Sequence, residues 1–519
     1  MSLLSAGCSR YLFKGRKQQF RAWCSTQMGA DMASGRNSGV NRTSPTYSCF
    51  CNKALAQYAN RRIGADLARR GFLIGMGATM LSAVLPELVR AQGASPAAAA
   101  PQPVTFTNFR LFDGKSAGLR DGMYLVVEGS RISQLGQGQP PAAGTNRTID
   151  CGGKVMMPGM IEMHWHAMLA SLLIQTILQA DLGLVYLAAS AEAQRTLLRG
   201  FTTIRDVGGP AFALKQAIDA GMIPGPRIYP SGAMITTTGG HGDFRPLTDI
   251  PRTTGEVSAQ ERTGANAIAD SADEVRLRVR EQFLQGATQI KIVGAGGVST
   301  PRSPLDMLTF TEQQLRAAVE TAGDWGTYVA VHAYTSEAVK RAVAAGAQCI
   351  EHGHLMDDHA AEIMAKNGTW LSTQPFVNED DVGPLAGPIL DKFREVIVGT
   401  NNMYKLARKH GLKVAFGTDL IFSPAVAARQ GLMIGNMTRW YNGSEILRMV
   451  TGGNGELLEL SGKRNPYPAR LGVLEQGAWA DLLVVGGNPL DNVGLLADPD
   501  KNLKLIMKDG RIYKDAMQT

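Results

Sequence analysis

The sequence predicts an α/β fold: a (β/α)8 TIM-like barrel with a small β-sandwich domain built from both ends of the mature chain. Three observations lead to this prediction. Short apolar runs alternate with helical patterns across residues 156–467. Several of these runs end in a histidine, a lysine or an aspartate, where a buried strand would usually end in an apolar residue or a turn. Short alternating strands punctuated by glycine occur at both ends of this region.

The N-terminal segment, residues 1–93, is predicted to be a leader, and a low-complexity linker follows at 94–103. The pair Arg69-Arg70 precedes an apolar stretch and then small residues, which is the pattern of a twin-arginine export signal. We therefore expect a periplasmic or secreted protein, with no stable membrane span after cleavage. The alternatives are an organellar transit peptide, because residues 1–62 are basic and rich in serine, and an uncleaved membrane anchor.

The net charge of +8 arises in this leader, whose only acidic residues are Asp31, Asp66 and Glu87. The rest of the chain is close to neutral, so its charge gives no reason to expect a nucleic-acid partner. Beyond the leader the only cysteines are Cys151 and Cys349, which excludes a disulfide framework. We expect both to be buried thiols.

The β-rich segments that flank the barrel are residues 104–155 and 468–516. The first contains runs such as VTFTNFRLFDG and MYLVVEG, and the second contains DLLVVGG and LKLIMKDGRIY. Each run is short, alternating and bounded by glycine or aspartate, as strands are. We expect the two segments to pair and to form one small sandwich.

The barrel region, residues 156–467, contains eight predicted strands: Met156–His166, Thr202–Asp206, Arg227–Ser231, Gln289–Ile292, Val329–His332, Cys349–His352, Trp370–Thr373 and Val414–Asp419. Helical patterns separate many of them, including Asp273–Gln285, Thr311–Ala322, Ser336–Ala345 and Glu395–Lys409. Repeated β–α units predict a parallel sheet, and eight units predict a closed barrel.

Six residues at the ends of these strands have side chains that can bind a metal: His164, His166, Lys291, His332, His352 and Asp419. The C-terminal strand ends form one face of a barrel, so we expect the six to converge there. In the pair His164 and His166, the period of two places both imidazoles on one side of a strand, where they can chelate one ion. A single histidine at a strand end is more often structural, but six coincidences are improbable. Zinc fits such ligands best, and manganese or cobalt could replace it.

Lys291 lies between β-branched residues in a strand that we expect to be buried. A buried ammonium group is costly, so it needs a carboxylate partner or loses its proton. A neutral amine can add carbon dioxide, and the two oxygens of the resulting carbamate could bridge two cations. The alternative is a buried ion pair with Asp419. We expect Asp419 to bind one metal and to serve as general base toward a metal-bridging hydroxide; its alternative role is a helix cap.

Several of these segments resemble the amidohydrolase superfamily, over roughly residues 104–516. The motifs that carry the resemblance are PGMIEMHWH (Pro158–His166), the lysine strand, VHAY (Val331–Tyr334), IEHGH (Ile350–His354) and GTD (Gly417–Asp419). The segments SGAMITTTGGHGD (Ser231–Asp243) and IKIVGAGGVST (Ile290–Thr300) resemble its binuclear-metal branch, which holds Xaa-Pro dipeptidases and ochratoxin-hydrolysing amidases. One departure is Glu162, which stands where the family usually has aspartate.

The resemblance implies two divalent metal ions, most simply zinc, and a carboxylated Lys291 between them. It implies that one ion is held by His164, His166 and Asp419, and the other by His332 and His352. The expected reaction is hydrolysis of an amide or peptide C–N bond in a small molecule, such as a dipeptide, an N-acyl amino acid or an ochratoxin-like amide. A homo-oligomer is compatible with this interpretation.

Other functions remain open at this point. One is a lactonase or phosphotriesterase, and another is a hydrolase of cyclic amides similar to imidazolonepropionase. A third is a non-catalytic exported metal-binding protein. Thr335 stands where related deaminases place a catalytic glutamate, which argues against deamination.

Three further polar residues are predicted to contact the substrate. His241 lies in a glycine-rich loop after the third strand, and we expect it to act on the substrate's carbonyl or carboxylate. Tyr334 follows His332 and would polarise the scissile carbonyl. His354 follows His352 and would line the pocket. The alternative for each is a structural role.

Overall fold

The computed structural model describes residues 103–140, 147–250 and 257–518. The predicted leader, residues 1–93, lies outside these ranges, so the twin-arginine export signal stays a prediction. Within the described ranges, no helix combines the length and the apolar character that crossing a bilayer requires.

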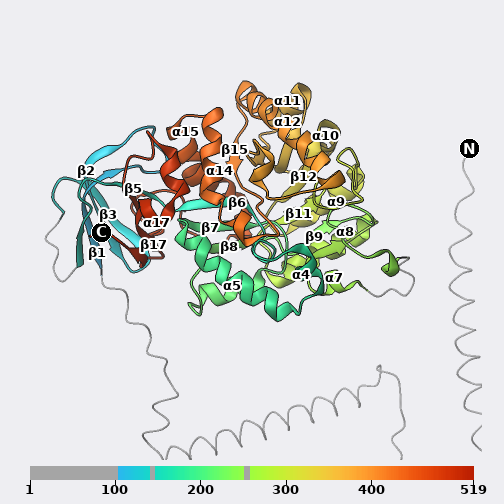
Figure 1. The fold of residues 1–519 in the computed structure, drawn as a ribbon, viewed down its shortest axis with the longest axis horizontal. Helices are drawn as coiled ribbons and strands as arrows, with labels where there is room; N and C mark the ends of the chain where they lie inside the picture. Colours follow the sequence, from blue (N-terminus) through green and yellow to red (C-terminus); the bar gives the residue numbers. More distant parts are fainter. Residues whose placement is uncertain (1–102, 141–146, 251–256, 519) are drawn as a thin grey trace, which may run out of the picture. The chain divides into compact units, whose positions relative to one another are not determined.

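Strands from the two ends of the described chain form a single eight-stranded sheet, here called the terminal sheet. Its order is β18-β17-β16-β5-β1-β2-β3, with β4 beside β1. The strand β5 joins the two halves, because it pairs with β1 on one side and with β16 on the other. In Figure 1 the N-terminal strands, in blue, accordingly lie beside the C-terminal strand β17, in red. The strands are β1 (Val104–Leu111), β2 (Arg120–Glu128), β3 (Arg131–Gln137), β4 (Arg147–Asp150), β5 (Val155–Pro158), β16 (Leu482–Val485), β17 (Leu503–Lys508) and β18 (Arg511–Asp515).

The pairing of the two ends agrees with the sequence-based expectation, and one boundary differs. The run predicted as the first barrel strand is divided at Gly159 between β5 of the terminal sheet and β6 of the barrel. Gly159 packs against Thr202, and a Cβ at this position would lie 2.1 Å from the threonine hydroxyl. The structure also assigns the terminal strands to one continuous hydrogen-bonded sheet, where the sequence predicted a sandwich.

Eight parallel strands form the barrel. Three of them make one hydrogen-bonded sheet and five belong to a second, which also includes the short β9 (Met234–Thr236) and β10 (Asn266–Ile268). Hydrogen bonds link the two sheets at both seams. The strands are β6 (Met160–Trp165), β7 (Phe201–Asp206), β8 (Arg227–Pro230), β11 (Ile290–Val293), β12 (Val329–Thr335), β13 (Cys349–Leu355), β14 (Trp370–Thr373) and β15 (Val414–Phe416).

The two seams, between β8 and β11 and between β15 and β6, are joined in different ways. At the first, the backbone N–H of Thr288 donates to Pro230 O at 2.8 Å, which brings the start of β11 to the end of β8. At the second, the side-chain amide of Asn454 donates to Ile161 O of β6 at 2.7 Å and to Phe416 O of β15 at 2.9 Å. A single buried asparagine therefore ties the first barrel strand to the last.

Helices cover the outside of these strands, as Figure 1 shows for α8 to α12. Helices α8 and α9 begin at the capping residues Ser271 and Thr311, each of which forms a reciprocal capping box with the residue three positions on. The helix predicted at Glu395–Lys409 begins earlier, with Pro388 in its first turn. The longer helices are α5 (Leu182–Leu198), α6 (Phe212–Asp219), α8 (Ala272–Gln285), α9 (Glu312–Asp324), α10 (Ser336–Ala344), α11 (Asp358–Lys366) and α12 (Gly387–His410).

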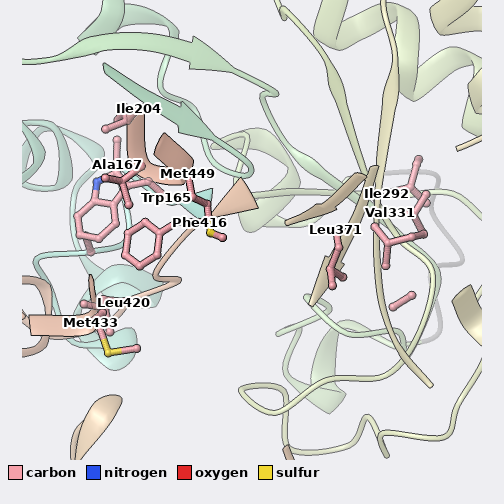
Figure 2. Packing of buried hydrophobic residues seen from close by; sticks show 14 of the residues in the cluster. Trp165, Ala167, Ile204, Ile292, Val331, Leu371, Phe416, Leu420, Met433 and Met449 are labelled. Carbon is pink, nitrogen blue, oxygen red and sulfur yellow. The ribbon is translucent and has the colours of Figure 1, made fainter. Parts of the chain in front are cut away.

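Apolar side chains fill the space between strands and helices. Ile292 and Val331 occupy paired positions on β11 and β12, and Figure 2 shows them side by side. At the other end of the strand series, Trp165, Phe416 and Leu420 belong to the same buried cluster. The apolar core therefore continues around the barrel and holds its strand ends in fixed positions.

A stack of aromatic and charged groups fixes the terminal sheet to the barrel. The guanidinium groups of Arg131 and Arg227 lie 3.5 and 3.8 Å from the ring centre of Trp479. Arg227, at the first position of β8, also forms an ion pair with Asp481 at 3.2 Å. Because Arg227 begins its strand, this contact lies at the N-terminal end of the barrel strands and leaves their C-terminal ends free for a site.

Candidate metal centre

The six predicted ligands all lie on barrel strands or in the residues that directly follow them. His164 is on β6, Lys291 on β11, His332 on β12 and His352 on β13, while His166 and Asp419 follow β6 and β15. All six line one cavity of about 480 Å³. The structure therefore places them at one mouth, although they are up to 255 positions apart in the sequence.

The ligating atoms approach one another closely. Nε2 of His164 and Nε2 of His166 each lie 3.5 Å from Oδ1 of Asp419. One ligand atom each of His164, His352 and Asp419 lies within 4.8 Å of the others. The ring centres of His332 and His352 are 4.4 Å apart. Two ligands of one zinc ion at about 2.1 Å are separated by roughly 3 to 4 Å, so the two 3.5 Å distances suit a cation shared by His164, His166 and Asp419.

Each of the four imidazoles forms a hydrogen bond to the protein through only one of its two ring nitrogens. Its N–H donates to a neighbouring oxygen that can only accept, so the other nitrogen keeps its lone pair. The partners are Glu351 Oε2 for His164 Nδ1 at 2.7 Å, Gly208 O for His166 Nδ1 at 2.9 Å, Gly296 O for His332 Nε2 at 2.8 Å and Gln374 Oε1 for His352 Nδ1 at 2.8 Å. This is the arrangement of metal-binding histidines, in which the second nitrogen fixes tautomer and orientation.

Lys291 is 3% exposed, and within the described part of the chain its amine makes no hydrogen bond or ion pair. The predicted alternative, an ion pair with Asp419, is thus not formed. Burial lowers the pKa of Lys291, although the charges of Glu351 and Asp419 act in the opposite direction. A buried amine without a partner is what carbamate formation would require.

The protonation states also suit a cation. Burial, and then the charge of Lys291, lowers the pKa of His166 to about 4, and burial places the pKa values of His164, His332 and His352 well below the usual range. Burial raises the pKa of Asp419 to about 7. The second nitrogens of the four neutral imidazoles, the carboxylate of Asp419 and the amine of Lys291 face one another, and this set fits a divalent metal ion by its chemistry.

The backbone holds two of these ligands in an uncommon conformation. His352 has a φ of 80° and Asp419 a φ of 52°, in the left-handed region that L-residues rarely adopt. The backbone N–H of Asp419 donates to His164 O at 2.9 Å, which fixes the turn after β15 against β6. Gly417 in this turn has no room for a side chain, because a Cβ would lie 2.5 Å from that of His164. Such strain concentrates at functional sites.

Glu162, the departure from the family pattern, is completely buried behind the site. Its carboxylate accepts hydrogen bonds from the backbone of His164 at 3.1 Å and of Thr418 at 2.8 Å, and from the hydroxyl of Thr418 at 2.9 Å. Glu162 therefore links the backbone of His164, one candidate ligand, to Thr418, the residue before the candidate ligand Asp419. Asp206 has a similar role, since it accepts from the backbone of Ala167, next to His166, at 2.7 Å.

The three predicted substrate contacts lie in different surroundings. His241 and Tyr334 line the cavity, and the ring of His241 stacks on that of His332 at 4.6 Å. Burial lowers the pKa of His241 to about 3 and raises that of Tyr334, so both rings are neutral. His354 is absent from the cavity lining; its Nε2 donates to Gln374 O at 3.0 Å, and its ring stacks on Phe376.

Comparison with known proteins identifies the family. Residues 155–513 match the amidohydrolase family. The chain belongs to the amidohydrolase family. Its α/β fold is that of the TIM-barrel superfamily, extended by the terminal sheet.

Relatives of known structure or activity support this assignment. A prolidase in complex with N-methylphosphonate-L-proline is 33% identical, with a TM-score of 0.73 over 80% of this chain and all of that one. A Xaa-Pro dipeptidase with methionine in its active site is 29% identical, with a TM-score of 0.68 over 80% of this chain and 100% of that one. Ochratoxinase of Aspergillus niger is 27% identical over 61% of this chain, and the match spans 66% of its own length.

Sequence reasoning missed three residues that support the amidohydrolase site. Arg205 and Glu351 are fully buried charged residues in strands, and Gln374 follows β14 and binds His352. The criterion that singled out Lys291, a charge within an apolar strand, also applies to Arg205 and Glu351 and would have found them. Nothing in the local sequence distinguishes Gln374.

Replacement of Glu162 by the aspartate common in the family tests its contacts. Glu162→Asp withdraws the carboxylate by one methylene, so its bonds to Thr418 and His164 cannot all persist. We expect the zinc affinity to fall about 10-fold, as for other residues that orient ligands. Competition with a chromophoric chelator measures the affinity. An unchanged affinity would show that Glu162 does not position the ligands.

Metal binding should weaken as the pH falls below about 7. The pKa of Asp419 in the metal-free protein is about 7, so below that pH a proton competes with the cation. The imidazole of His166, with a pKa of about 4, does not compete until much lower pH. We expect the apparent zinc affinity to increase by up to about 10-fold for each unit by which the pH is raised toward 7, as Asp419 loses its proton. Chelator competition from pH 5.5 to 8.5 measures this, and a decline confined to the region near pH 4 would contradict it.

Proposed function

We propose that this amidohydrolase is a metal-dependent hydrolase that cleaves amide or peptide C–N bonds of small substrates, of the dipeptide or N-acyl amino acid type. It would hold two divalent cations, most simply zinc, with carboxylated Lys291 as the shared ligand. The observation that supports this most strongly is the free lone pair on each of four buried imidazoles, beside Asp419 and the unpaired Lys291. A single ion would leave some of these donors without a partner.

The walls of the cavity suit an apolar or aromatic substituent. One wall comes from Val382 and Leu385, in the segment between β14 and α12, and from Ile389 and Phe393 in the first turns of α12. Phe244 and Phe422 meet edge to face, with ring centres 6.4 Å apart, and also line the cavity. Such walls bind apolar groups on either side of a scissile bond. Two similar proteins of known structure, a prolidase and a Xaa-Pro dipeptidase, hold small ligands, namely N-methylphosphonate-L-proline and methionine.

The side chains around the cations would share the remaining work. Two bound cations would supply Lewis-acid polarisation and a water of lowered pKa. Asp419 would accept a proton from that water and return it to the leaving nitrogen. The Tyr334 hydroxyl, neutral and facing the cavity, would donate a hydrogen bond to the developing oxyanion. His241 would orient the substrate from the opposite loop.

The role of Lys291 is tested by its removal. Lys291→Ala should abolish activity and lower the bound zinc from two ions per chain, because it removes the shared ligand of the proposed centre. Wild-type protein equilibrated with ¹³C-bicarbonate should show a carbamate carbon signal that the variant lacks. Lys508→Ala, which removes a buried lysine of the terminal sheet, is the matched control and should keep zinc, signal and activity. Full zinc content in Lys291→Ala would refute the bridging role.

Substrate class is tested with a panel of compounds on zinc-loaded enzyme. The panel contains dipeptides, N-acyl amino acids with aliphatic or aromatic acyl groups, aryl amides, lactones and phosphotriesters. We expect turnover of amides, with kcat/KM increasing with the apolar area beside the scissile bond. Turnover of lactones or phosphotriesters without any amide would contradict the proposal. Zinc binding without any turnover would favour the non-catalytic alternative.

A further inference from the structure

Beneath the metal-binding residues, the barrel interior holds a fully buried arginine. Arg205 on β7 is 0% exposed. Its Nε donates to Met163 O at 2.7 Å, and its Nη1 donates to the Tyr328 hydroxyl at 3.0 Å. Its Nη2 donates to Glu351 Oε1 at 2.5 Å and to the Ser372 hydroxyl at 3.0 Å. One guanidinium group thus contacts residues on three other strands, β6, β13 and β14, and Tyr328, which directly precedes β12.

Glu351 connects this arginine to the metal centre. Its side chain is 0% exposed, and its two oxygens have separate partners. Oε1 accepts from Arg205 and from the Cys349 thiol at 3.2 Å, and Oε2 accepts from His164 Nδ1 at 2.7 Å. The chain of contacts therefore runs from Arg205 through a carboxylate to the imidazole whose other nitrogen faces Asp419.

The geometry is more specific than folding alone requires. A buried ion pair seldom stabilises a fold more than well-packed apolar residues of the same volume would, because desolvation offsets most of the attraction. Here one carboxylate oxygen is directed at a candidate metal ligand. A carboxylate behind a histidine fixes its tautomer and raises the basicity of the nitrogen that binds the metal.

We propose that Arg205 and Glu351 are positioning residues that set the affinity of the cation bound through His164. Glu351 orients the imidazole and increases its donor strength, and Arg205 compensates the charge of Glu351 and anchors it to β6, β12 and β14. This inference rests on the proposed metal centre. It concerns one of the two cations, because the other imidazoles donate to uncharged oxygens of Gly208, Gly296 and Gln374.

The test is a zinc titration of metal-free protein in competition with a chromophoric chelator, with zinc content measured by elemental analysis. Glu351→Gln keeps the shape of the side chain and removes its charge. We expect one of two zinc sites to weaken by about 10- to 100-fold and the other to remain near its wild-type affinity. Asp481→Asn is the matched control: it neutralises one partner of another buried ion pair, between Asp481 and Arg227, where the terminal sheet meets the start of β8. It should retain both wild-type affinities.

A second variant covers the case in which Glu351→Gln does not fold. Arg205→Lys retains the positive charge but cannot reach Met163, Tyr328 and Glu351 together. We expect a smaller loss of affinity at the same zinc site. Two affinities within twofold of wild type in the folded Glu351→Gln protein, or in Arg205→Lys where that is the folded variant, would overturn the inference while leaving the metal centre intact. A wild-type protein that binds no zinc would overturn both.

Discussion

The constraint on which the site depends is that each of its four imidazoles is hydrogen-bonded to the protein through only one of its two ring nitrogens. Each donates one N–H to a fixed oxygen, so the second nitrogen must present its lone pair to the same small space. Lys291 and Asp419 face this space as well. Without cations these groups are desolvated and unsatisfied, which costs free energy, and bound cations would satisfy them. Cation binding at this candidate site would therefore stabilise the folded barrel.

The surrounding structure holds these groups in place in layers. Next to the ligands, Glu162 and Asp206 bind the backbone beside His164, His166 and Asp419. Below them, Arg205 and Glu351 cross the barrel interior, where apolar side chains would otherwise meet. Asn454 joins the first strand to the last at the level of Ile161 and Phe416. Polar groups thus replace part of the apolar core that usually fills a barrel. The apolar contacts between strands and helices remain the main source of the stability of the fold.

The strand order and the convergence of the six candidate ligands on one cavity could be predicted from sequence, because both leave local signals. An apolar run identifies a strand, and a histidine or aspartate at its end stands out. No such signal shows that Val155–Pro158 belongs to the terminal sheet, because one apolar run of the sequence continues from β5 through Gly159 into β6. His354 illustrates another limit. Simple alternation places it with His352, but positive φ values at His352 and Gly353 interrupt the alternation, and His354 turns toward Gln374.

The site also separates the groups that determine chemistry from those that determine binding. The candidate metal ligands come from several barrel strands and the residues just after them, so their geometry depends on the whole fold. The apolar walls come largely from connections, such as the segment before α12 that carries Val382 and Leu385. Connections tolerate substitution and insertion far better than barrel strands do. Because wall contacts bind the substrate and the transition state alike, changes there would alter which compound is held and leave the reaction unchanged. Members of one family could in this way share the metal chemistry and differ in substrate.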